Sequence, residues 1–230
     1  MRESKRSACI ATAMLLVTFA VRHESRFFRR TPAAAGVRIV HTGIGTTAAA
    51  RILHHELAMN RPEAVISSGF AGGLDPSLKV GDLIAGESVS SPELITLVSS
   101  NVFRGRIHTV ASPIELAEAK ARLYRETAAH AVDMETEAVV GECGRAGVPV
   151  LVIRAISDGA GDEIPVPLEI AWDLEKQRAR PMQLCGYLAM RPGRIGAFGR
   201  FLGSTNTASR ALAHEVSKLL TLRADHIINE

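Results

Sequence analysis

Short, almost purely apolar runs alternate along the chain with amphipathic stretches of helical period. Six runs predict β-strands: residues 15–21, 37–45, 64–73, 80–89, 103–112 and 149–157. The pattern of residues 103–112 is the weakest of the six. Four stretches predict helices: residues 46–60, 114–128, 134–147, which Gly147 ends as a C-cap, and 207–222. Strands without a polar face are buried on both sides, so the alternation predicts an α/β layered domain.

The composition of the chain changes near residue 164, where prolines, basic residues and helical runs replace the apolar strands. A length of 230 residues allows one large domain or two small ones with an ample core. We place the α/β core at residues 14–163. Residues 164–230 are predicted to form a helical part that completes the same domain.

The N-terminal sequence MRESKRSACIATAMLLVTFAV resembles a secretory signal, because basic residues precede an apolar run. The run leads directly into Arg22, His23 and Glu24 without a small-residue cleavage site, and it is too short to span a bilayer. We therefore interpret residues 15–21 as a buried first strand, with Met14 as an alternative start of the chain.

The composition is that of an ordinary globular protein, with 47% hydrophobic and 22% charged residues. A net charge of only +3 argues against a general nucleic-acid binder. The three cysteines, Cys9, Cys143 and Cys185, have no metal-site or redox-motif spacing. They predict buried thiols in a reducing compartment, and hence a cytoplasmic protein.

Two glycine-rich turns follow predicted strands. Gly43 and Gly45 lack the third glycine of a dinucleotide fingerprint, so a Rossmann cofactor site is not expected. This turn is either a tight strand-to-helix connection or a set of backbone N–H groups that hold an anion or a ribose hydroxyl. The turn SGFAGG, residues 68–73, is small enough for backbone to approach a flat ligand closely.

Acidic residues gather at the start of the predicted helix 134–147. Asp133, Glu135 and Glu137 occupy alternate positions, and residues two apart do not share a helix face. The plain interpretation is a set of acids that stabilise the helix N-terminus. However, Glu24, the SGFAGG turn and Asp158 all follow predicted strands, where α/β sheets bind their ligands. Together they predict one ligand site.

Several segments of the chain resemble those of a known protein superfamily. The segments FAVRHES, HTGIGTTAAA, ISSGFAGGLDPSLKVGDLI, AVDMETEAV and VLVIRAISDGAGDE resemble, in order, the nucleoside phosphorylase and nucleosidase superfamily. The resemblance covers about residues 15–163 and implies a three-layer α/β/α sandwich with a central mixed sheet. Within the superfamily, VDMET and the tail 164–203 most resemble the hopanoid-associated phosphorylase branch. That likeness implies an adenosine-type nucleoside linked to a lipid.

The resemblance also implies roles for individual side chains in cleaving a ribosyl C1′–N bond. Asp158 would protonate or hydrogen-bond N7 of the purine, Glu24 would activate water, and Arg154 would lie near Asp158 or orient the nucleophile. Glu135 would accept hydrogen bonds from the ribose hydroxyls, with Met134 packed against the sugar. The other implied substrate-binding positions are Val132, Asp133, Phe70, Ala71, Gly72 and Gly45. The carboxylates of Asp133 and Glu137 are expected on the helix surface.

The nucleophile is less certain from the sequence than the reaction type. Where phosphorylases of the hexameric purine type hold phosphate with an arginine and a serine, this chain has Ser67 and Phe70. Without that arginine, phosphate has no bidentate partner, which favours a nucleosidase, a hydrolase, over a phosphorylase, a glycosyltransferase. Phe70 also replaces the serine near the water of hydrolytic relatives, so a catalytically silent nucleoside-binding protein stays open. In the segment between Gly81 and Ala131, Phe103 is the candidate for an aromatic ring that stacks on the base.

The C-terminal segment mixes aromatic residues with leucines and arginines. Trp172, Tyr187, Phe198 and Phe201 belong either to helices that pack over the core or to an apolar lid. Such a lid would receive a lipid tail and rest on an anionic membrane surface. No cofactor, metal or nucleic-acid partner is expected. The resemblance implies a homo-oligomer, a dimer or higher.

Overall fold

The computed structural model describes the backbone of residues 14–228 and the side chains of residues 14–222. Cys9 and the basic N-terminal segment lie outside the described residues. The predicted first strand is confirmed as β1, Leu15–Phe19. Cys143 is buried as predicted, but the prediction for Cys185 is wrong because this residue is exposed on a helix, Pro181–Met190, that has no buried residue.

A mixed sheet of eight strands forms the centre of the molecule, with the path β2-β1-β3-β8-β4-β5 and with β7 linking β3 to β6. Besides β1, the strands are β2 Arg38–His41, β3 Ala64–Gly73, β4 Leu83–Gly86, β5 Phe103–Gly105, β6 Ile107–Thr109, β7 Ala131–Asp133 and β8 Val150–Asp158. Strands β2, β1, β3 and β8 are parallel, whereas β4 runs antiparallel to β8 and β7 antiparallel to β3.

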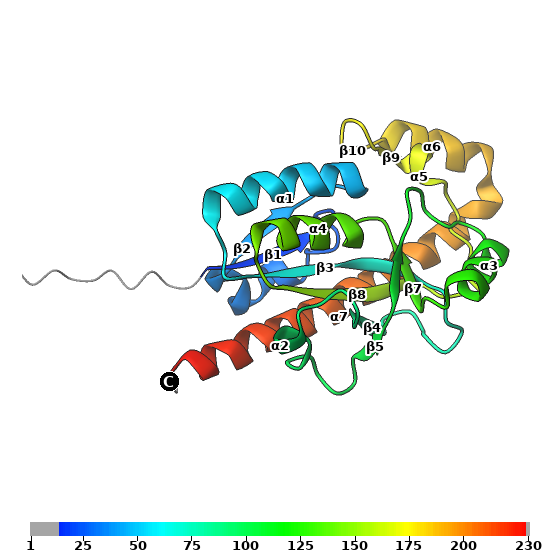
Figure 1. Cartoon of the computed structure of the whole chain (residues 1–230). Helices are drawn as coiled ribbons and strands as arrows, with labels where there is room; N and C mark the ends of the chain where they lie inside the picture. The colour runs from blue at the N-terminus through cyan, green and yellow to red at the C-terminus, as the bar shows by residue number, and fades with distance from the viewer. Residues whose placement is uncertain (1–13, 229–230) are drawn as a thin grey trace, which may run out of the picture.

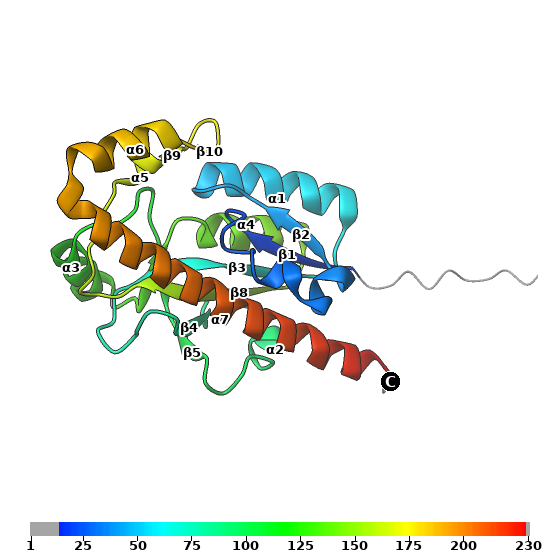
Figure 2. The ribbon, with the colours of Figure 1, turned by 180° about the vertical axis from the view of Figure 1, so that it is seen from behind.

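Helices cover both faces of this sheet. They are α1 Thr46–Asn60, α2 Pro92–Ile95, α3 Ala117–Thr127, α4 Thr136–Ala146, α5 Leu168–Ala171, α6 Pro181–Met190 and α7 Ile195–Ile228. Helices α1 and α4 lie side by side on one face, and α7 crosses the other (Figures 1 and 2). The predicted three-layer sandwich with a mixed sheet is therefore confirmed.

Strand β8 lies at the centre of the core, and all nine of its residues are buried. On one face, Val152 packs with Leu53 of α1 and Val139 of α4. On the other face, Ile153 packs with Leu212 of α7. Burial on both faces explains why the sequence of this strand lacks the alternation of polar and apolar residues seen in half-exposed strands.

The largest difference from the predicted elements concerns the C-terminal helix. It was expected at residues 207–222, yet α7 begins at Ile195. Glycines at positions 196, 199 and 203 make the first part a poor helix by propensity. Residues 195–204 are all exposed or half-buried, so burial does not account for the longer helix; Phe201 and Thr205 of α7 line the cavity described below. The residues before it include a two-stranded hairpin, β9 Trp172–Asp173 and β10 Arg178–Ala179.

Candidate active site

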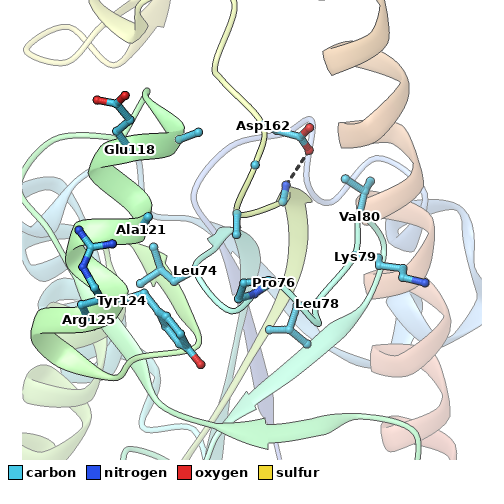
Figure 3. A pocket seen from close by; sticks show the side chains of 14 residues that line it. Leu74, Pro76, Leu78, Lys79, Val80, Glu118, Ala121, Tyr124, Arg125 and Asp162 are labelled. Atoms are coloured by element: carbon cyan, nitrogen blue, oxygen red, sulfur yellow. Dashed lines mark hydrogen bonds between the residues drawn. The ribbon is translucent and has the colours of Figure 1, made fainter.

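A cavity of about 290 Å³ lies where β1, β3 and β8 end. Its walls include three carboxylates that are far apart in the sequence, those of Glu24, Glu135 and Asp158. A larger cavity, of about 840 Å³, lies between α3 and the loops that follow β3 and β8, and is lined by Leu74, Tyr124 and other side chains (Figure 3). We assign the candidate site to the smaller cavity because the carboxylates converge there and small-molecule sites combine apolar walls with a few polar groups.

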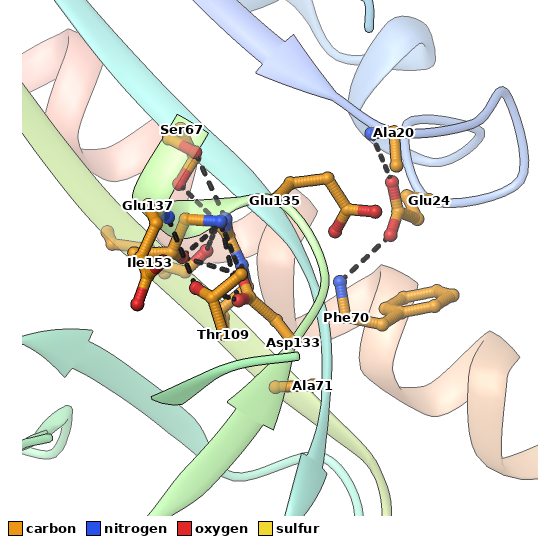
Figure 4. A network of polar contacts seen from close by, with 12 residues as sticks. Ala20, Glu24, Ser67, Phe70, Ala71, Thr109, Asp133, Glu135, Glu137 and Ile153 are labelled. Carbon is orange, nitrogen blue, oxygen red and sulfur yellow. Dashed lines mark hydrogen bonds and ion pairs between the residues drawn. The ribbon is translucent and has the colours of Figure 1, made fainter. Parts of the chain in front are cut away.

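Glu24 is held by backbone N–H groups immediately after β1. Its Oε2 accepts hydrogen bonds from the backbone N–H groups of Ala20 at 2.6 Å and Val21 at 3.1 Å. Its Oε1 accepts one from Phe70 N at 2.9 Å (Figure 4). Burial raises the pKa of Glu24, partly offset by these backbone hydrogen bonds and by the nearby Arg154 charge. A carboxyl in this setting is suited to exchange a proton near neutral pH.

Glu135 lies between β7 and α4 and faces the same cavity. Its Oε1 accepts a hydrogen bond from Gly45 N at 2.7 Å. Burial, reinforced by the negative charge of Asp133, raises its pKa to about 8. Gly45 adopts φ +91°, a conformation that favours glycine, so the turn aims its N–H at Glu135. The anion predicted for this turn is thus a side chain of the protein itself.

The prediction that Asp133 lies on a helix surface is wrong. Asp133 ends β7, is buried, and forms an ion pair with Arg154 at 2.8 Å between Oδ2 and Nε (Figure 4). It also accepts hydrogen bonds from the N–H and hydroxyl of Thr136, the first residue of α4. Asp133 therefore caps the helix from inside the core. Glu137, by contrast, is exposed as predicted.

Arg154 extends from the middle of β8 toward the sugar-binding side of the predicted site, not toward Asp158. Besides Asp133, its guanidinium donates to the backbone carbonyl of Ser67 at 2.9 Å, to the Ser67 hydroxyl at 3.2 Å and to the Thr136 hydroxyl at 2.9 Å. The first of the two predicted placements of Arg154 is therefore wrong. The second, beside the nucleophile, remains compatible with its position.

Asp158 ends β8 and lines the cavity, but its partner was not predicted. Its Oδ2 lies 2.5 Å from Nζ of Lys120, which is fully buried, and its Oδ1 accepts a hydrogen bond from the Ser157 hydroxyl at 2.6 Å. Lys120 belongs to α3, whose sequence is that of an ordinary amphipathic helix. Lysine is rarely buried, so nothing in the local pattern distinguishes Lys120 from the exposed charges around it.

A much smaller cavity adjoins the carboxyl groups of Glu24 and Glu135. It is lined by Glu24, Glu135, Arg154 and the adjacent serines Ser67 and Ser68, among others. The space open to the centre of a water-sized molecule is about 10 Å³, the size that holds a single water. The hydroxyl of Ser68 is buried and has no hydrogen-bond partner among the described residues. The cavity is thus small, polar and acidic.

Most of the predicted site residues line the main cavity. The structure places there Glu24, Phe70, Ala71, Gly72, Val132, Asp133, Met134, Glu135 and Asp158. Arg154 and Gly45 lie behind it. Sequence reasoning missed the remaining wall residues, which are Ala20, Val21, Ile44, Val110, Pro113, Ile114, Ser157, Ile164, Leu168, Phe201 and Thr205. Most come from loops or from α7, where no local motif marks them.

The predictions for SGFAGG and for Phe103 need correction. Residues 68–73 are the end of strand β3 and not a turn after it. Their small size makes room for a side chain, since a Cβ at Gly69 would lie 3.2 Å from Oε1 of Glu24. Phe103 does not reach the cavity, because it packs against His130 with ring centroids 5.0 Å apart. The aromatic walls of the cavity are Phe70 and Phe201.

Within the described residues, no group of three or more His, Cys, Asp or Glu side chains is arranged to hold a metal ion. None of the helices within residues 14–228 is both long and apolar enough to cross a membrane.

Residues 9–93 and 86–189 match the family model described as the phosphorylase superfamily. The chain belongs to this superfamily. A 5′-methylthioadenosine/S-adenosylhomocysteine nucleosidase of Marinomonas sp. (strain MWYL1) is 29% identical over 58% of this chain and 72% of its own length. One of Geobacillus kaustophilus (strain HTA426) is 28% identical over 59% and 69%. The predicted family is thereby confirmed.

Solved structures show the same fold. Futalosine hydrolase of Helicobacter pylori aligns with a TM-score of 0.67 at 18% identity, covering 91% of this chain and 98% of that one. The Neisseria meningitidis 5′-methylthioadenosine/S-adenosylhomocysteine nucleosidase, in complex with methylthio-immucillin-A, gives 0.67 at 20% identity, covering 90% and 98%.

Proposed function

We propose that the protein is a nucleosidase that hydrolyses the N-glycosidic bond of an adenosine-type nucleoside and releases the purine base. The observation that carries this proposal is the convergence of Glu24, Glu135 and Asp158 on one cavity. The named nucleosidases among its relatives support the same reaction class. Reactions of this type pass through an oxocarbenium-like sugar, which neighbouring carboxylates stabilise.

At the sugar end, Glu135 accepts hydrogen bonds from the ribose hydroxyls and Met134 packs against the ring. As positive charge develops on the sugar, a carboxylate at this position becomes more stabilising than it was in the ground state. Burial raises the pKa of Glu135 to about 8, so this carboxyl holds a proton at neutral pH before a ligand binds. The positive charge that develops on the sugar would favour loss of that proton and so produce the carboxylate. At the base end, Asp158 hydrogen-bonds the departing purine.

Water is the proposed nucleophile. The small cavity between Glu24, Glu135 and Arg154 has the size of one water molecule. Phosphate would need more space and a free bidentate cation, whereas Arg154 is already bonded to Asp133. Glu24, with its raised pKa, would accept the proton of the attacking water.

The substituent at the 5′ position is proposed to be apolar, and a lipid-linked nucleoside is our candidate. The segment that follows the cavity residue Leu168 and precedes Phe201 carries α6, every residue of which stays at least partly exposed. Met182 is 86% exposed and Met190 75%. Exposed arginines flank this helix: Arg178, Arg191, Arg194 and Arg200. An apolar helix with arginines around it is suited to an anionic membrane surface.

Co-sedimentation with phosphatidylcholine–phosphatidylglycerol vesicles tests this membrane contact. We expect the protein in the pellet at low salt, less of it at high salt, and less again for the double variant Met182→Ser/Met190→Ser. Wild-type protein that stays in the supernatant at low salt would remove the membrane part of the proposal and leave the nucleosidase part intact. A cytoplasmic location and a homo-oligomer stay predictions, the latter open to analytical ultracentrifugation.

Release of free adenine from adenosine, methylthioadenosine and an adenosyl lipid, with and without phosphate, tests the nucleosidase itself. We expect release without phosphate, and a loss on the order of 100-fold or more in Asp158→Asn, the usual range for a removed general acid. Release only with phosphate would establish a phosphorylase instead. Intact nucleoside binding without release would establish a catalytically silent protein.

A further inference from the structure

The hairpin formed by β9 and β10 lies beside the N-terminal end of α1 (Figure 1). Gln177, in the loop of this hairpin, contacts Ile44, a residue 133 positions earlier that lines the cavity. Its Oε1 accepts a hydrogen bond from the Ile44 N–H at 2.8 Å, and its Nε2 donates to the Ile44 carbonyl at 3.0 Å. One side chain thus binds both backbone polar groups of Ile44, as a residue of a paired β-strand would.

The backbone of Gln177 has φ +47°, a left-handed conformation that is uncommon outside glycine. The other non-glycine residues with positive φ among the described residues, Arg61 and Ala128, end helices, whereas Gln177 ends none. Strain of this kind persists where surrounding contacts hold it. The side chain supplies such contacts, because Nε2 also donates to the Leu174 carbonyl at 2.7 Å and so uses both of its N–H donors.

Both sides of the contact are shaped for it. On the turn, Gly43 makes room for the side chain, since a Cβ there would lie 2.7 Å from Oε1 of Gln177. On the hairpin, Asp173 pairs with Arg180 at 2.9 Å and accepts a hydrogen bond from the Lys176 N–H at 3.0 Å. These contacts within the hairpin fix the place from which Gln177 reaches the turn.

The peptide group between Ile44 and Gly45 connects this contact to the cavity. Its carbonyl accepts the hydrogen bond of Gln177, and its N–H donates to Oε1 of Glu135 at 2.7 Å. A peptide group is planar and, here, trans, so its C=O and N–H point in opposite directions. The hydrogen bond that fixes the carbonyl therefore also aims the N–H at Glu135. Hydrogen bonds in such a chain strengthen one another.

The carboxyl group of Glu135 is oriented as a result. Gly45 binds Oε1, and the other oxygen, Oε2, has no hydrogen-bond partner among residues 14–222. Since Glu135 lines the cavity, a group attached to the protein by one oxygen can present the other to a ligand. Gln177 itself is not among the residues that line the cavity.

We propose that Gln177 is a positioning residue that orients Glu135 through the Ile44–Gly45 peptide group. The hairpin of the C-terminal segment thereby completes the sugar end of the cavity without touching the ligand. That the ligand at this end is a ribose rests on the proposed function. The orientation of Glu135 by Gln177 does not.

The amide proton signal of Gly45, in ¹⁵N–¹H spectra of the full chain, tests this orientation without relying on catalysis. A short hydrogen bond to a carboxyl group moves the signal downfield, and the signal follows the protonation of that group. In wild type we expect a downfield signal that titrates with the pKa of Glu135, about 8. In Gln177→Met the signal should move upfield and this pKa should rise, because a misdirected N–H stabilises the carboxylate less.

The other charged groups that face Glu135 are unaltered by this substitution. They are Asp133, Glu24 and Arg154. A change in the titration of Gly45 therefore reports the lost amide of Gln177, which a purely structural role of the hairpin would not produce. Gln183→Met is the matched control, because Gln183 is an exposed glutamine on α6. It should leave the signal and the pKa unchanged.

Two further variants sharpen the test. Gln177→Glu can still accept from the Ile44 N–H but, once ionised, cannot donate to the Ile44 carbonyl. It should therefore change the Gly45 signal as Gln177→Met does, if the effect passes through that carbonyl. Gln177→Gly removes the side chain and the backbone strain together, so it serves if the methionine variant fails to fold. It should give the same change.

The rate of base release gives a second readout. We expect kcat/KM to fall on the order of 10-fold in Gln177→Met, the upper range for one hydrogen bond, and to stay unchanged in Gln183→Met. A changed Gly45 signal with an unchanged kcat/KM would overturn the statement that the hairpin completes the sugar end.

The orientation itself would be overturned by a Gly45 signal and titration that are the same in wild type and in a folded Gln177→Met or Gln177→Gly protein. A normal signal in Gln177→Glu would overturn the route through the carbonyl. These outcomes are separate from the fate of the proposed reaction. A protein whose Gly45 signal depends on Gln177 but that releases no base would refute the nucleosidase and leave the orientation of Glu135 by Gln177 standing.

Discussion

The carboxyl groups at the two ends of the cavity have different hydrogen-bond and ion-pair partners. At the proposed sugar end, Glu24 and Glu135 are held by backbone N–H groups, while the nearby cation, Arg154, is bonded to Asp133. At the proposed base end, Asp158 has a buried lysine of its own. Each of these proposed ends has a buried cation, Arg154 or Lys120, but Arg154 pairs with Asp133 and not with Glu24 or Glu135, whereas Lys120 pairs with Asp158 itself.

This difference shows how acidic residues in one cavity can differ in their chemistry. Without a direct ion-pair partner, the buried acids of the sugar end have raised pKa values and can exchange protons with a bound ligand. Asp158, by contrast, has the ammonium group of Lys120 2.5 Å away. The assignment of roles therefore depends on where the buried cations are placed, more than on which positions are acidic.

The largest effect on stability is expected from removing the cation of the sugar end. Arg154→Met leaves Asp133 buried without its partner, and breaking a buried pair in this way costs about 3–5 kcal/mol. Urea denaturation of the variant should show a correspondingly lower free energy of unfolding. Arg122→Met is the control, since Arg122 pairs with Glu126 and both side chains are exposed.

That surface pair is screened by water, so Arg122→Met should leave the free energy of unfolding nearly unchanged. Equal destabilisation by the two substitutions would contradict the distinction between the buried and the exposed arginine. The double variant Asp133→Asn/Arg154→Met should recover part of the loss, because no charge then remains buried alone.

A smaller effect should appear as a dependence of stability on pH. The pKa of Glu135 rises from 4.5 to about 8 on folding, so the folded protein holds a proton that the unfolded chain releases. Its contribution to stability is complete below pH 4.5 and is lost as the pH rises toward 8. Glu135→Gln should remove this loss and stabilise the protein at pH 8 by roughly 1–3 kcal/mol.

Thermal or urea denaturation between pH 5 and about 8 measures this slope. The amide oxygen of the glutamine can still accept the hydrogen bond of Gly45, so the turn is preserved. Glu137→Gln, an exposed acid two residues along the chain, should leave the slope as it is. A Glu135→Gln protein whose stability falls with pH as steeply as wild type would contradict the raised pKa of Glu135.

Much of the site could be predicted from local sequence because its parts sit at the ends of strands. Asp158 ends β8, the glycines of residues 68–73 lie at the end of β3 and Glu24 follows β1, and α/β sheets bring such ends together. Asp133 was misjudged because it was assigned to a helix. It is in fact the last residue of a three-residue strand, too short to be recognised by its pattern.

The sequence by itself determined the layered fold, the strands β1, β3 and β8, the helices α1 and α4, and the acids at the ends of β1 and β8, since these depend on hydrophobic periodicity and on residues close together in the chain. Only the tertiary structure decided which cation meets which carboxylate. Arg154 and Asp133 are 21 residues apart, and Lys120 and Asp158 are 38 apart. Burial then set the pKa of each acid, because desolvation depends on atoms contributed by every layer of the fold.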